Sequence, residues 1–112
     1  MSKIVIALGG NALGKTPSEQ LSILEGVSKV IVDLIEKGNK VILTHGNGPQ
    51  VGQISLAMEY ASNGSAATPS MPFAECGSMS EGYIGYHIEQ SIMNELNKRD
   101  IDKSIVALIT EV

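Results

Sequence analysis

The sequence has little of what secreted, membrane-spanning and nucleic-acid-binding proteins depend on. Its 112 residues include one cysteine, no tryptophan and one phenylalanine. The lone Cys76 cannot form an intrachain disulfide, which is typical of a protein from a reducing compartment. No apolar run is long enough to span a bilayer, and the first residues lack the pattern of a signal peptide. We therefore expect a cytoplasmic protein with no membrane partner.

Positive charge is also scarce. Eight lysines and arginines face twelve acidic residues, which gives a net charge of −4. Without a basic stripe or basic residues interleaved with aromatics, nothing offsets the repulsion of a phosphate backbone. We therefore expect no nucleic-acid partner. Apolar residues make up 43% of the chain, which suits one globular domain with an aliphatic core.

The first half of the sequence predicts a strand followed by a helix. Residues 4–8, "IVIAL", form a short apolar run that is typical of a strand buried on both faces. Thr16, Pro17 and Glu19 then form a helix start, with threonine at the N-cap and proline at the first helical position. Gly38 follows the apolar stripe of this helix and predicts its end.

The remaining residues repeat the alternation. Residues 40–46 predict a second buried strand, 50–61 a helix, 62–72 a loop, 80–99 a third helix and 104–112 a third strand. Strands that alternate with helices imply an α/β fold with a parallel sheet. Three strands make a small sheet for so many apolar helices, so we expect this sequence to be the first part of a longer protein.

Residues 9–16, "GGNALGKT", match the P-loop pattern G-x-x-x-x-G-K-[ST]. In a P-loop, the lysine and the threonine open the helix, so that the hydroxyl reaches the metal. Here Thr16 precedes Pro17, and a residue before proline is displaced from the helical region. The sequence therefore predicts that Thr16 caps the helix and that this turn is not a P-loop.

Two glycine turns follow the first two predicted strands. The first is Gly9, Gly10 and Asn11, and the second is Gly46, Asn47 and Gly48. Ligands of open parallel sheets bind outside the carboxyl ends of the strands, where these turns would be neighbours. Bare backbone amides, a helix N-terminus and neutral asparagine amides together would make an anion pocket. The alternative is that the glycines only form tight turns and each asparagine caps a helix.

The strings "GGNAL", "HGNGPQVG" and "CGSMSEGYIGY" resemble the amino-acid kinase family, and within it the carbamate kinases. The resemblance implies a three-layer αβα sandwich with a mainly parallel sheet. It also implies reversible phosphoryl transfer between ATP and carbamate, giving ADP and carbamoyl phosphate, as in arginine degradation, by a homodimer. Carried over by position, Gly9, Gly10 and Asn11 would bind the small-molecule substrate from one side, and Gly46, Asn47 and Gly48 from the other.

The resemblance also implies what this sequence does not carry. Some relatives that phosphorylate larger amino acids have a lysine in the first strand, where this chain has Ala7. The lysines that clamp the phosphoryl group, and the site for ATP or ADP with Mg²⁺, are expected beyond Val112. Residues 1–112 would then be the substrate-binding part, with no catalytic residue or metal ligand of their own, and inactive alone. Another amino-acid kinase and a non-catalytic anion-binding fragment remain alternatives.

Four further residues invite a chemical role, and the sequence favours a structural one for each. Lys15 lies near the first turn, but a solvated surface lysine is the commoner case. We expect His45 to pack and hydrogen-bond beside the second turn, and His87 to be a packing or interface residue. Cys76 lacks a histidine or second cysteine at ligand spacing, so we expect a small buried side chain.

Overall fold

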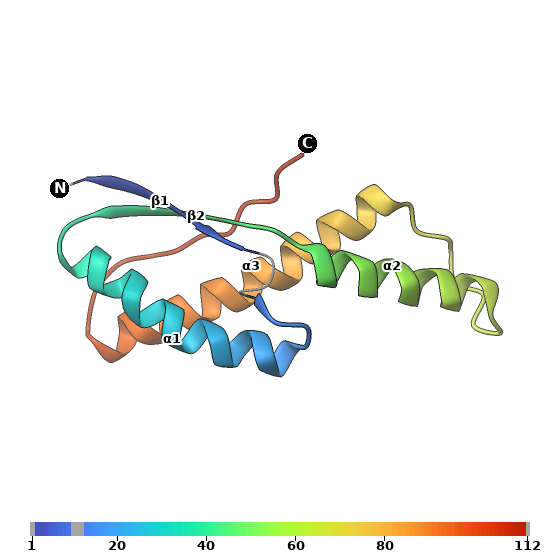
Figure 1. The fold of residues 1–112 in the computed structure, drawn as a ribbon, viewed down its shortest axis with the longest axis horizontal. Helices are drawn as coiled ribbons and strands as arrows, with labels where there is room; N and C mark the ends of the chain where they lie inside the picture. The colour runs from blue at the N-terminus through green and yellow to red at the C-terminus, as the bar shows by residue number, and fades with distance from the viewer. Residues whose placement is uncertain (1, 10–12, 112) are drawn as a thin grey trace.

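A computed structural model describes residues 2–9 and 13–111 of the chain. Two strands alternate with the first two helices, and a third helix follows the second with no strand between them (Figure 1). In chain order they are β1 (Lys3–Leu8), α1 (Pro17–Glu36), β2 (Lys40–His45), α2 (Gly48–Asn63) and α3 (Phe73–Lys98). None of these helices is both long and apolar enough to cross a membrane, as far as the described residues show.

The two strands pair in parallel, in a register that runs from Lys3 opposite Lys40 to Leu8 opposite His45. A parallel pair needs a crossover connection, and α1 supplies it. The β-branched runs predicted as strands at the sequence level therefore form one sheet, and their last residues lie side by side. The α/β fold class with a parallel sheet is confirmed.

The helices α1 and α3 cover one face of this sheet. Every second residue of each strand faces the core between the sheet and these two helices. The buried core residues of α3 recur every four residues, so they lie on one face of the helix. The buried core comprises Leu8, Leu13, Leu24, Ile31, Val32, Ile84, Ile88, Ile92 and Leu96. On the opposite face, Val5 is 65% exposed and Ile42 is 53% exposed. The expectation that both faces of the strands are buried is therefore wrong for these residues, because the helices that pack on the sheet lie on one side.

Helix α1 begins and ends where the sequence predicted. Thr16 has the extended backbone of an N-cap, and its hydroxyl accepts a hydrogen bond from the amide of Glu19 at 3.2 Å. The Glu19 carboxylate reaches back to the amide of Lys15 at 2.9 Å, which satisfies a second amide before the helix. At the other end Gly38 has a φ of +90°, the left-handed conformation that suits glycine after a helix.

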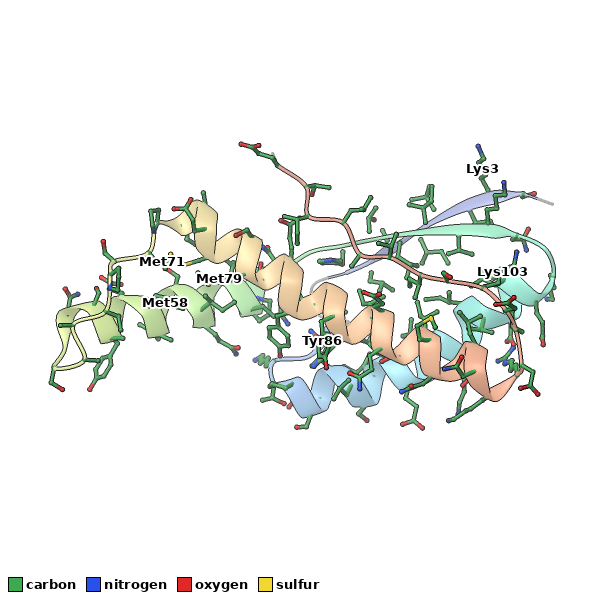
Figure 2. All side chains as sticks on the ribbon, turned by 180° about the vertical axis from the view of Figure 1, so that it is seen from behind. Lys3, Met58, Met71, Met79, Tyr86 and Lys103 are labelled. Atoms are coloured by element: carbon green, nitrogen blue, oxygen red, sulfur yellow. The ribbon has the colours of Figure 1, made fainter. Side chains whose placement is uncertain are left out.

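Helix α2 and the first turns of α3 extend away from the sheet as a pair (Figure 1). Helix α3 begins at Phe73 rather than near residue 80, because its first turns pack against α2 and this outweighs the weak helix propensity of its glycine and serines. Met58, Met71 and Met79 lie together where α2 faces the start of α3 (Figure 2). The flexible methionine side chains fill an irregular contact here.

The third predicted strand does not form. Residues 101–111 have no assigned secondary structure, although they run beside β2 in the same direction (Figures 1 and 2). A cavity of about 620 Å³ is lined by β2 and this segment together with residues of α1 and α3. The segment is held by α3 instead: both the amide and the hydroxyl of Thr110 donate to Glu81, at 3.1 and 2.8 Å.

The cap of α1 gives a stability prediction. Thr16→Ala removes the side-chain acceptor of the Glu19 amide and should lower the free energy of unfolding by about 1 kcal/mol. Ser22→Ala, at an exposed position inside the same helix, is the matched control and should leave stability equal or slightly higher. Urea unfolding followed by circular dichroism measures both. Equal midpoints for Thr16→Ala and the parent chain would contradict the assigned cap.

Candidate functional site

The two glycine turns are neighbours, as the sequence predicted. Leu8 and His45 end their strands opposite each other, and the amide of Gly46 donates to the carbonyl of Leu8 at 3.4 Å. The chain therefore leaves the sheet at adjacent points into both turns. Gly9 opens the first turn and is exposed. Gly10 and Asn11 lie outside the described residues, so their predicted contact with substrate stays a prediction.

Asn47 does not have the capping role that was the alternative. It occupies the N-cap position of α2, but its side chain makes no hydrogen bond to the first turn. Its amide nitrogen instead donates to the hydroxyl of Ser80 on α3 at 2.8 Å. One amide hydrogen and the amide oxygen of Asn47 have no hydrogen-bond partner among the described residues. The side chain thus ties the second turn to α3 while keeping a polar group at the turn.

The N-terminus of α2 has the properties of an anion site. It has no side-chain cap, no acidic residue in its first turn and a proline near its start. The first amides of an α-helix have no partner within the helix and carry a partial positive charge. Small anions bind at such ends through these amides. The site at α2 is therefore electropositive although the chain as a whole is acidic.

The glycines at the two turns are not required by the packing of the described residues. Neither Gly9 nor Gly48 has a positive φ, and a Cβ built on either would meet no heavy atom within 4 Å. Both positions border open space from which a ligand can approach the backbone closely.

The structure excludes a P-loop at residues 13–19. Gly14 has a φ of +69°, and Lys15 and Thr16 precede α1 rather than opening it. The Thr16 hydroxyl accepts the Glu19 amide, as described above, and Lys15 is exposed to solvent. The cation and hydroxyl are thus not aligned on the first turn of the helix, which is the geometry that a P-loop needs.

His45 and Cys76 have the structural surroundings that the sequence predicted. Ring nitrogen Nδ1 of the half-buried His45 lies 2.9 Å from the carbonyl oxygen of Gly46, beside the second turn. Cys76 is fully buried, with its thiol 3.8 Å from the carbonyl of Met71. Within residues 2–9 and 13–111 no three histidine, cysteine or acidic side chains gather closely enough to hold a metal ion.

His87 packs in the interior, as expected, but it also has a specific partner. Its ring nitrogen Nδ1 lies 2.9 Å from the side-chain oxygen of Gln20. The ring of Tyr83 meets it edge-on at 5.2 Å, and the ring of Tyr86 lies at 5.8 Å. Burial among these groups lowers the pKa of His87 below its usual value of 6.5, because the charged form loses hydration. The neutral ring therefore donates its Nδ1 hydrogen to Gln20.

Comparison with known proteins places this geometry in context. Residues 2–109 match the amino acid kinase family. The chain is 54% identical over all 112 residues to a carbamate kinase of Staphylococcus haemolyticus, and 54% identical to carbamate kinase 3 of Staphylococcus aureus. It covers 36% of each of these proteins, so it spans about a third of the length of the curated relatives it matches.

Solved structures agree with the sequence relatives. A carbamate kinase from Giardia matches 93% of this chain with a TM-score of 0.82 at 36% identity, and the chain covers 36% of that protein. The Giardia lamblia enzyme bound to AMP-PNP matches 88% of this chain with a TM-score of 0.80 at 38% identity, and 35% of that protein is covered. The arrangement of helices and parallel strands in this chain is thus that of the corresponding part of these kinases.

The burial of His87 predicts a pH dependence. Its ring should titrate with a midpoint below 6.5 in the folded chain. Between that midpoint and pH 6.5, the unfolded chain binds more protons than the folded chain, so the free energy of unfolding should fall as the pH falls through this window. His87→Gln should remove this contribution. NMR titration of the ring protons measures the midpoint, and a value at or above 6.5 would contradict the described environment.

Proposed function

Because the chain belongs to the amino acid kinase family, we propose that it is the acid-substrate part of a carbamate kinase. The proposed reaction is reversible phosphoryl transfer between ATP and carbamate, which yields ADP and carbamoyl phosphate. The observation that carries the proposal is the pair of adjacent turns, of which the second opens directly into the uncapped N-terminus of α2.

The chemistry of the two turns suits a small planar anion. Carbamate and the transferred phosphoryl group are both negatively charged, and backbone amides at a helix N-terminus hold such groups without a counter-charge. The second amide hydrogen of Asn47, which has no partner among the residues that the structure describes, adds a neutral donor at the same place. Phosphoryl transfer depends chiefly on alignment and charge stabilisation. The role we assign to Gly9, Gly10, Asn11, Gly46, Asn47 and Gly48 is therefore to bind and orient the acid substrate.

ATP or ADP with Mg²⁺ belongs to the same proposal but to another part of the protein. A related kinase has been solved with AMP-PNP bound, and the relatives extend well beyond the 36% that this chain covers. The described residues hold no group of three metal-ligating side chains. We therefore assign nucleotide binding, and the lysines that neutralise the phosphoryl group, to sequence outside these 112 residues. The homodimer is part of the same proposal.

A chimeric enzyme tests the function. Residues 1–112 would replace the matching segment of the Staphylococcus haemolyticus carbamate kinase, to which they are 54% identical. The chimera should form ATP from ADP and carbamoyl phosphate, whereas the 112-residue chain alone should form none. A folded chimera without this activity would overturn the proposal. A chimera that phosphorylates glutamate or acetylglutamate instead would favour the other amino-acid kinases, which Ala7 argues against.

Two glycines of α2 provide a matched pair of variants in this chimera. Gly48→Ala places a methyl group at the proposed approach to the helix N-terminus and should lower kcat/KM for carbamoyl phosphate at least tenfold, about 1.4 kcal/mol of transition-state stabilisation. Gly52→Ala lies one turn further along the exposed helix, where a Cβ also meets nothing within 4 Å. It should leave kcat/KM unchanged and raise stability slightly. Equal kinetics for the two variants would contradict the placement of the site.

A further inference from the structure

Three glutamine side chains hold the segment that follows the first glycine turn. The amide nitrogens of Gln20, Gln50 and Gln53 donate to the three successive backbone carbonyls of residues 13–15, over 3.2, 3.1 and 2.8 Å. These carbonyls precede α1, so no helix uses them. We name these three residues the glutamine clamp. Each amide matches one carbonyl, which fixes this stretch of backbone in position along its whole length.

The clamp joins the two halves of the proposed site. Gln20 comes from α1, whereas Gln50 and Gln53 stand three residues apart on one face of α2. Gln50 lies two residues after Gly48, inside the first turn of α2. Its hydrogen bond to the carbonyl of Gly14 therefore connects the segment at residues 13–15 directly to the N-terminus of α2, which follows the second turn.

Helix α3 forms a hydrogen bond to each side of the proposed site, through His87 to Gln20 and through Ser80 to Asn47. Because the amide nitrogen of Gln20 is used on a backbone carbonyl, its oxygen faces His87 and accepts the Nδ1 hydrogen at 2.9 Å. About two turns earlier on the same helix, the hydroxyl of Ser80 accepts a hydrogen bond from the side-chain amide of Asn47 at 2.8 Å. Gln20 and Gln50 are almost completely buried. The buried amide nitrogens of both residues are hydrogen-bonded, as is Oε1 of Gln20, whereas Oε1 of Gln50 is buried with no hydrogen-bond partner among the described residues.

We propose that Gln50 and Gln53 are positioning residues of the acid-substrate site, because they hold the segment after the first glycine turn, at the carbonyls of Gly14 and Lys15, against the first turns of α2. This inference rests on the proposed function and deepens it. The amides of the two turns must face one small anion at the same time, and a shift of about an ångström between binding groups is enough to reduce the rate of an oriented reaction greatly. The clamp acts through the backbone of residues 13–15 and does not touch the substrate.

A substitution at Gln53 tests the positioning role without disturbing the fold. Its side chain is exposed and bonds to the carbonyl of Lys15, so Gln53→Met removes the donor without leaving a cavity. Gln90→Met, at an exposed glutamine of α3, is the control for the loss of a surface amide. Gln50→Met is the second variant, in which the buried member of the clamp is lost. All are made in the chimeric enzyme described above.

We expect loss of a clamp residue to change KM for carbamoyl phosphate but not KM for ADP. Gln53→Met should raise KM for carbamoyl phosphate three- to tenfold and leave KM for ADP and the melting temperature unchanged, and Gln90→Met should change none of these. Gln50→Met should raise the same KM further. In an active chimera, an unchanged KM for carbamoyl phosphate in Gln53→Met, or an equal rise for ADP, would overturn the inference while the proposed function stands. A folded chimera without activity would overturn both.

A second readout does not depend on activity. The backbone amide of Lys15 donates to the carboxylate of Glu19 at 2.9 Å, so its hydrogen exchange reports whether residues 13–15 stay in place. Gln53→Met should speed this exchange at least threefold, and Gln90→Met should leave it as it is. Exchange that is equal in the two variants would show that the clamp does not hold the segment, and the inference would fail on that ground alone.

Discussion

The parallel pairing of β1 with β2 is the contact on which the rest of the structure depends. Its register places Leu8 opposite His45, so the chain leaves both strands at one edge of the sheet. A shift of one residue would turn each inward-facing side chain to the exposed face and would move the two turns out of line. The apolar residues of α1 and α3 that pack on the inner face stabilise this register. The site is therefore a consequence of how the core packs.

At that edge, Pro17 determines that the turn before α1 is a helix cap and not a P-loop. Pro17 makes Thr16 an N-cap, with its hydroxyl bonded to the amide of Glu19, and the amide of Lys15 is bonded to the Glu19 carboxylate, so neither amide is available to a phosphate. Helix α2 has the opposite arrangement, because Asn47 leaves its first turn uncapped and bonds to Ser80 instead. The two helices begin near the same sheet edge, and the uncapped one is available to an anion.

Local features of the fold could be predicted from the sequence, and non-local ones could not. The cap at Thr16, the end at Gly38 and the buried stripe of α3 follow from interactions within a few residues. The apolar composition of residues 104–112 predicts a third strand, but strand formation needs a partner strand, and Thr110 of this segment bonds to Glu81 on α3 instead. The partners of Gln50 and Gln53 lie 36 and 38 residues away in the chain, and no short-range pattern in the sequence indicates such contacts.

The central claim is that the two glycine turns form one anion pocket at the carboxyl ends of β1 and β2. Titration of the isotopically labelled chain with inorganic phosphate, followed by the NMR shifts of its backbone amides, tests this most directly. If the pocket forms, the amide signals of Gly9, Gly48 and Gln50 should shift together along one saturable curve, and the amide signals of residues 15–19 should not shift. Shifts confined to residues 15–19, or no saturable shift at either turn, would contradict it.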